Sequence, residues 1–108
     1  MTVSEMASAL ALTPLVESDV ERKVEGGYTG DLLSWVMGRA QAGDVWVTIM
    51  SNANIVAVAT LADTAAIVLA EGVTLEDDVT ALARSKGINI YTSTQNAFTL
   101  CGKIAALL

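Results

Sequence analysis

The stretch Asp44–Ala70, DVWVTIMSNANIVAVATLADTAAIVLA, decides the fold of this chain. Its two ends, Asp44–Met50 and Ala65–Ala70, are apolar runs rich in β-branched residues, a pattern typical of buried strands. The segment between them, Asn54–Ala62, would suit a strand by its Val and Ile content. It also has a helical apolar face behind a capping residue, and two parallel strands need a crossover of this length. We therefore expect a strand, a helix and a parallel strand.

The alternation of helices and strands continues to the end of the chain. Thr74 is expected to cap a helix that stops before Gly87, with acidic residues in its first turn. The segment 88–93, INIYTS, predicts a strand, and Thr94 is expected to open the last helix. This order predicts a mostly parallel sheet with right-handed crossovers, flanked by helices in a three-layer α/β arrangement.

The first part of the chain is less regular. Ser4 can cap a short helix that ends at Thr13, the segment 13–18, TPLVES, predicts a strand, and Val20–Val24 predicts a second extended piece. The segment 25–31, EGGYTGD, lacks the spacing of both common phosphate-binding glycine loops, so we expect a turn permitted by glycine. A helix over Asp31–Ala42 should follow it.

Composition limits the possible functions. The chain of 108 residues fits one domain, residues 1–108, and its net charge of −6 makes nucleic acid a poor partner. The longest apolar reach is interrupted by Asp63 and is too short for a membrane span. The amino-terminal residues lack the basic start of a secretory signal, and the single cysteine suits a reducing compartment, so a cytoplasmic location is expected.

The residue types present argue against an enzyme. Histidine is absent, which removes the commonest general base and metal ligand. The acidic run Glu76–Asp78 fits a solvated first helical turn better than a metal site. Cys101 lies in the apolar stripe of the last predicted helix and is expected to be a core residue. We expect no metal and no cofactor.

Trp35 is the strongest candidate for a contact with another protein. On the predicted helix it lies away from the apolar stripe, so it would face solvent in an isolated domain. An exposed Trp invites a partner, and we expect an interface that also includes Tyr28 and Arg39. The alternative is that Trp35 packs against the amino-terminal segment or Tyr28.

Polar residues follow the three strands of the predicted parallel sheet. Ligands usually bind beyond the carboxyl ends of such strands, although the same residue types are also ordinary helix caps. The candidate ligand-binding residues are Ser51, Asn52, Asn54, Glu71, Thr74, Ser93 and Thr94.

Three segments together resemble the DRTGG domain family: EGGYTGDLLSWVMGRAQAGDVWVTI (25–49), NIVAVATLADTAAIVLAEG (54–72) and GINIYTSTQNAFTLCGKI (87–104). The resemblance covers nearly the whole chain. It implies a regulatory segment of the kind found beside cystathionine-β-synthase-type domains in some pyrophosphatases and phosphotransacetylases, with stand-alone versions in bacteria. The implied fold is similar to the N-terminal domain of HPr kinase, without the kinase activity.

The chain differs from the family at the residues that name it. Asn52, Ala53 and Asn54 stand where an Asp-Arg pair would precede the middle helix, and Ala70-Glu71-Gly72 stands where Thr-Gly-Gly would follow the middle strand. The resulting expectation is a non-catalytic regulatory or protein-interaction module, a homodimer that couples to a partner protein of a regulatory pathway. The alternative is a sensor domain that binds a small molecule such as an adenine nucleotide at the strand ends.

Overall fold

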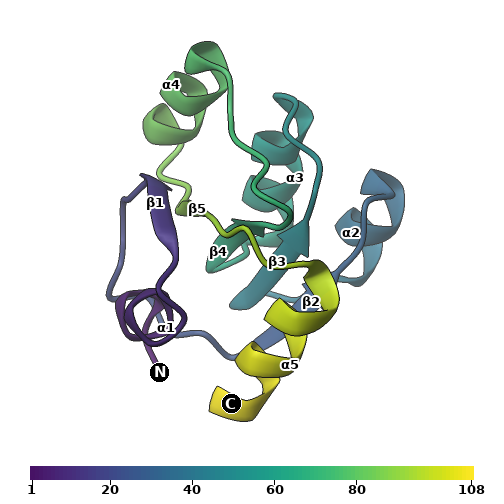
Figure 1. Ribbon diagram of the computed structural model, residues 1–108. Coiled ribbons are helices and arrows are strands. Elements are labelled where there is room, and N and C mark those ends of the chain that lie inside the picture. The colour runs from purple at the N-terminus through teal and green to yellow at the C-terminus, as the bar shows by residue number, and fades with distance from the viewer.

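The structure, a computed structural model, describes residues 1–108 as one five-stranded sheet with helices on both of its faces (Figure 1). In chain order its elements are α1 (Val3–Ala9), β1 (Thr13–Val16), β2 (Gly26–Thr29), α2 (Leu33–Arg39), β3 (Asp44–Thr48), α3 (Asn54–Ala62), β4 (Ala66–Leu69), α4 (Asp77–Ser85), β5 (Ile90–Thr92) and α5 (Ala97–Leu107).

The strands lie in the order β1-β5-β4-β3-β2. Strands β2 to β5 are parallel, and β1 pairs antiparallel with β5 at one edge of the sheet. The predicted unit of strand, helix and parallel strand is confirmed as β3, α3 and β4, because Val45 pairs with Ala66 and Thr48 pairs with Leu69. The prediction of a mostly parallel sheet is therefore correct.

Two apolar clusters, one on each face of the sheet, form the core and confirm the three layers. Alternate residues of β3 divide between them, since Trp46 belongs to one cluster while Val45 and Val47 belong to the other. The cluster with Trp46 includes buried residues of α2, α3 and α4. The cluster with Val45 and Val47 includes buried residues of α1 and α5. None of the helices combines the length and apolar composition that a bilayer crossing needs.

The glycine-rich segment 25–31 is the main correction to the sequence prediction. It was expected to be a turn, but residues 26–29 form the edge strand β2, with Tyr28 beside Trp46 of β3. Glycine is needed there for close packing: a Cβ on Gly26 would lie 2.7 Å from Oδ1 of the buried Asp44. The indole Nε1 of Trp46 donates to the Gly30 carbonyl oxygen at 2.9 Å and fixes the end of the strand.

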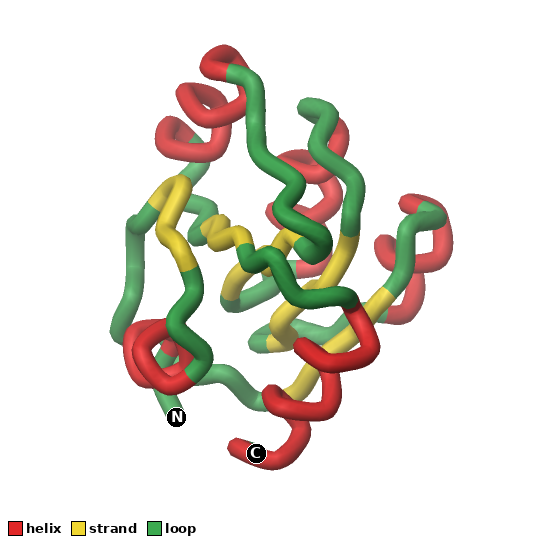
Figure 2. Tube along the Cα trace, viewed as in Figure 1, coloured by secondary structure: helices red, strands yellow, loops and turns green.

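The extended piece predicted at Val20–Val24 is not a strand of the sheet. Only an isolated bridge between Lys23 and Thr2 occurs there, and the whole connection from β1 to β2 is loop (Figure 2). Its backbone groups instead bond the start of α1, since the Val3 and Ser4 amides donate to the Arg22 and Val20 carbonyl oxygens. The Arg22 guanidinium also contacts the Asp63 carboxylate at 2.7 Å, which holds the loop to the end of α3.

The predicted helix starts lie close to the real ones but not on them. Helix α1 is capped by Thr2, whose hydroxyl accepts from the Glu5 amide in a capping box, and not by Ser4. Helix α4 begins after Glu76 instead of Thr74, and α5 begins after Asn96 instead of Thr94.

Helix α2 is shorter than the predicted Asp31–Ala42. Asp31 cannot begin the helix because its Oδ1 accepts from the Thr48 hydroxyl at 2.7 Å and from the Ile49 amide at 3.1 Å. The carboxylate thus ties the exit of β2 to the end of β3. Helix α3 has the predicted bounds, although Asn54 is its first residue and does not cap it. Asp63, directly after the helix, adopts the left-handed conformation with a φ of 58°.

Candidate functional site

The seven predicted ligand-binding residues lie in the loops or helix starts that follow β3, β4 and β5, at one edge of the parallel sheet. The structure brings part of this set together. The amide of Glu71 donates to the Gln95 carbonyl oxygen at 2.9 Å, and the amide of Gly72 donates to the Ser93 carbonyl oxygen at 2.8 Å. A Cβ on Gly72 would lie 4.0 Å from Cγ2 of Thr94. Glu71, Ser93 and Thr94 are therefore neighbours.

The residues after β3 form a separate, locally bonded group. The Asn52 Oδ1 accepts from the Asn54 amide at 2.9 Å, in a turn that leads into α3. No hydrogen bond joins Ser51, Asn52 or Asn54 to the loops after β4 and β5. Thr74 likewise makes no side-chain hydrogen bond, although the neighbouring Val73 carbonyl oxygen accepts from the Thr92 hydroxyl at 2.6 Å.

The helix starts at this edge differ in their suitability for an anion. Helix α4 has Glu76 at its N-cap and Asp77 and Asp78 in its first turn, and these acidic side chains would repel an anion. At α5 the Asn96 side chain already accepts from the Thr99 amide at 2.8 Å, so that donor is taken. Helices α2 and α3 begin without a capping side chain or an acidic first turn. None of the three surface cavities of the protein is lined by any of the seven residues.

One polar atom at this edge lacks a partner. The Gln95 Oε1 is buried and accepts no hydrogen bond, while its own backbone amide donates to the Ser93 hydroxyl at 3.1 Å. A buried acceptor of this kind is costly unless something donates to it. The ligand site at the strand ends stays a prediction, with Gln95 added to its surroundings.

Trp35 is exposed, as the sequence predicts. It lies on α2 with 52% of its surface accessible, and the guanidinium of Arg39, one turn later, stacks on its ring at 3.7 Å from the centroid. Leu32, the residue directly before α2, is also exposed. We call Leu32, Trp35 and Arg39 the α2 stripe.

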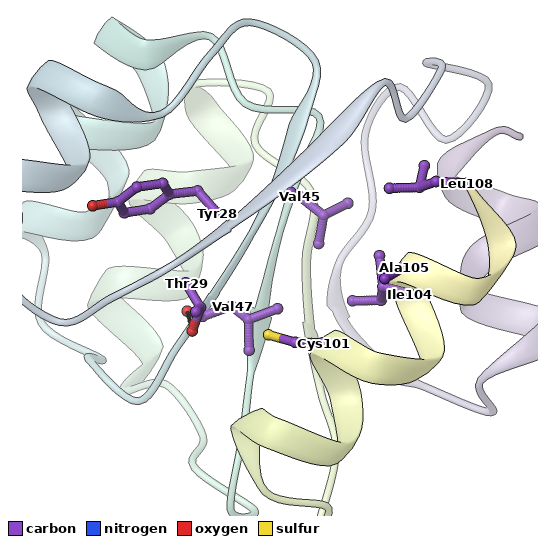
Figure 3. Close-up of a pocket in the computed structure, with 9 residues that line it drawn as sticks. Tyr28, Thr29, Val45, Val47, Cys101, Ile104, Ala105 and Leu108 are labelled. Carbon is purple, nitrogen blue, oxygen red and sulfur yellow. Dashed lines mark hydrogen bonds between the residues drawn. The ribbon is translucent and has the colours of Figure 1, made fainter.

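Tyr28 differs from the other two predicted interface residues. Its ring is half-buried and packs against the cluster formed with α2 and α3, on the face of the sheet opposite α5 (Figure 3). The ring also lies close to Gly30, where a Cβ would be 3.3 Å from Cε2. Tyr28 therefore lies on the edge strand, with its ring packed against this cluster and not fully exposed as Trp35 is.

An apolar slot on the other face of β2 was not predicted. It has a volume of about 320 Å³ and lies between the strands β2 and β3 and the last turns of α5 (Figure 3). Its wall includes Gly27, Val45, Ile104 and Leu108. The slot exists because Gly27 has no side chain to fill the space beneath the helix. The Gly26-Gly27 pair was the sequence signal for it, but only if the segment is a strand.

Cys101 lies in the wall of this slot. It packs against the core cluster that includes α1 and α5 but is only partly buried, so the expectation of a core residue is met in part. It is partly exposed, and its sulfur points toward Val47 and Thr29 (Figure 3). The buried stripe of α5 is centred on Leu100 and Ile104 instead, which rotates Cys101 to the rim of the buried face.

The charged and titratable side chains form pairs and not larger clusters. No three His, Cys, Asp or Glu side chains are close enough together to hold a metal ion. The ion pair with Arg22 lowers the pKa of Asp63. Burial raises the pKa of Tyr91 above its usual range, and its O–H donates to the Glu17 carboxylate at 2.7 Å, which raises the pKa further.

No model of a known protein family and no curated protein sequence matches this chain. Among solved structures, the chain is similar to the CBS and DRTGG domains of the regulatory region of Clostridium perfringens pyrophosphatase, which was crystallised with its activator, diadenosine tetraphosphate. The TM-score is 0.75 at 15% sequence identity, over 92% of this chain and 44% of the other. The likeness shows a shared fold, and this chain spans less than half the length of that structure.

Proposed function

We propose that this chain is a non-catalytic regulatory or protein-interaction module that works as a homodimer and couples to a partner protein. The observation that carries the proposal is the α2 stripe, where an exposed Trp is held in place by a stacked Arg. Trp and Arg are the side chains most often found at the energetic centres of protein interfaces. The stacking reduces the freedom that these side chains would lose on binding, which lowers the cost of association.

The shared fold supports this proposal. The pyrophosphatase region of similar fold is described as regulatory, and the resemblance of the sequence to DRTGG domains points the same way. The polar residues at the strand ends offer no nucleophile with an adjacent base, and their side-chain hydrogen bonds serve local turns.

Self-association is tested by measuring the mass of the protein in solution by light scattering after size exclusion. Replacing Trp35 by Ala should weaken the assembly by roughly 1 to 4 kcal/mol, the loss typical of an interface anchor. Leu61→Ala is the matched control, since Leu61 is an exposed apolar residue on α3 outside the α2 stripe. Equal effects of the two substitutions would contradict a specific role for Trp35.

A small-molecule sensor is the second candidate, and the unpartnered Gln95 Oε1 beside Glu71 and Ser93 favours it. The pyrophosphatase region was crystallised with a dinucleotide, so adenine nucleotides are the ligands to test. A ligand at 100 times its dissociation constant would stabilise the fold by about 2.7 kcal/mol, which raises the unfolding midpoint by several degrees. We expect no such shift with millimolar ATP, ADP, AMP or diadenosine tetraphosphate, because Glu71 and the acidic start of α4 repel phosphate. A shift abolished by Asn54→Ala or Thr94→Ala would favour the sensor.

A further inference from the structure

The outer edge of β2 is an unprotected strand edge. β2 pairs only with β3, on one side. The Gly30 amide donates to the Val47 carbonyl oxygen at 3.3 Å, and Thr29 is the register partner of Val47, so alternation along the strand directs the backbone groups of Gly26 and Tyr28 toward β3 and those of Gly27 outward. Natural proteins usually guard such edges with Pro, Lys or a bulge, and residues 26–29, GGYT, contain none of these.

We propose that the β2 edge is the seam of the homodimer, where β2 pairs antiparallel with β2 of a second copy and the two sheets become one ten-stranded sheet. This inference rests on the proposed self-association and specifies where it occurs. In the pairing we propose, the twofold axis passes through Gly27, so that Gly27 lies opposite Gly27 of the second copy and Tyr28 lies opposite Gly26.

The residues of β2 suit this pairing with themselves. Because its backbone groups point outward, Gly27 can exchange both of its hydrogen bonds with Gly27 of the second copy, and the two Cα atoms then lie about 5.5 Å apart. Tyr28 faces a glycine, a combination in which the aromatic ring covers the exposed backbone. A pairing centred on Tyr28 would instead place Glu25 opposite Asp31, and like charges directly opposite are destabilising.

A second copy fits the edge better than an isolated peptide strand does. A stable interface buries about 800 Å² on each partner, more than four strand residues supply. The remainder must come from the helices beside the edge: α2 on one face, and the end of α5, with Leu108 56% exposed, on the other. A twofold axis perpendicular to the sheet brings α2 toward α2 and α5 toward α5. Both exposed apolar surfaces are then covered together, whereas a peptide would leave them open.

Charge at the axis tests this seam directly. Gly27 is exposed, and a Cβ there would meet only the Val45 carbonyl oxygen, at an ordinary 3.6 Å, so the monomer should accept a side chain. Gly27→Lys and Gly27→Glu each place two like charges opposite each other in the dimer. We expect each to raise the dissociation constant at least about tenfold, and an equimolar mixture of the two to form a heterodimer close to wild-type strength.

Gly27→Ser is the uncharged control, and circular dichroism of all variants checks that the monomer remains folded. Charged variants that stay dimeric, or a mixture that stays monomeric while Gly27→Ser dimerises, would overturn this seam and leave the proposed function intact. A wild-type protein that is monomeric would overturn both. A dimer mass that is seen in the mixture but not in either charged variant alone would support pairing through Gly27. Two side chains must lie opposite each other across the axis for like charges to repel and opposite charges to attract.

Discussion

The guanidinium of Arg39 stacks on the ring of Trp35, with its central carbon 3.7 Å from the ring centroid. The two residues are four apart on α2 and both are exposed, so the contact holds Trp35 in one orientation without burying it. Because the protein core does not depend on this pair, changes to it should alter association and leave folding unchanged.

Arg39→Ala should therefore weaken self-association by about 0.5 to 1 kcal/mol, the value of an exposed cation–π contact. The unfolding midpoint should not change. Sedimentation equilibrium measures the first and thermal denaturation the second. Arg84→Ala on α4 serves as the control, because it removes the same charge far along the chain from the α2 stripe. A loss of the same size in both variants would indicate a general charge effect.

Gly26→Ala should destabilise the fold. The new Cβ would lie 2.7 Å from Oδ1 of Asp44, a buried carboxylate whose Oδ2 accepts from the Gln41 amide at 2.8 Å and so cannot move freely. Overpacking of this kind costs typically 1 to 3 kcal/mol. Gly27→Ala, one residue along the same strand, has ordinary space and should cost much less. Urea unfolding of the two variants, at concentrations where the protein is monomeric, compares them.

Glu71→Gly should stabilise the protein, and the adjacent Gly72→Ala should destabilise it. Both residues have left-handed backbone conformations, with φ values of 61° and 71°. A residue with a Cβ pays roughly 1 kcal/mol or more for that conformation, and glycine does not. The difference in midpoint between the two variants is the measurement. Opposite signs are expected, and equal signs would show that the loop conformation is not what controls stability here.

Alkaline pH should destabilise the protein through Tyr91. Its pKa is raised in the folded state, by burial and then by the Glu17 carboxylate. Below the ordinary tyrosine pKa of about 10, Tyr91 keeps its proton in both the folded and the unfolded state, so its contribution to the free energy of unfolding does not change with pH. As the pH rises past that value, the unfolded chain loses a proton that the folded chain retains, and the free energy of unfolding falls.

Tyr91→Phe should remove this part of the fall, so its stability should change less between about pH 9 and about pH 11. Denaturant unfolding at each pH measures it, and Tyr28→Phe is the control for tyrosine loss as such. Identical pH dependence in wild type and Tyr91→Phe would contradict the assignment.

Much of the fold follows from patterns that act over short distances. The run Asp44–Ala70 predicts β3, α3 and β4 because its β-branched ends and helical middle reflect burial on both faces of a sheet. The prediction of a turn over segment 25–31 is wrong because glycine is usually a sign of turns. Its strand conformation depends on long-range contacts, such as the Trp46 indole with Gly30 and the Asp44 carboxylate with Gly26, which local propensity does not contain.

The candidate sites show the same division. The exposure of Trp35 follows from helical spacing and is confirmed. The slot beside Cys101 could not be predicted, because it depends on β2 being a strand and on the rotation of α5 about Leu100. The parallel sheet explains why Glu71, Ser93 and Thr94 lie close together. The position of the loop after β3 depends on contacts between loops, which no sequence pattern specifies.

The mass of the wild-type protein in solution tests the central claim most directly. Light scattering coupled to size exclusion, repeated over a range of micromolar concentrations, should give about twice the chain mass of 11.2 kDa at the upper end and a decline toward the monomer on dilution. A mass equal to a single chain at every concentration would contradict the homodimer.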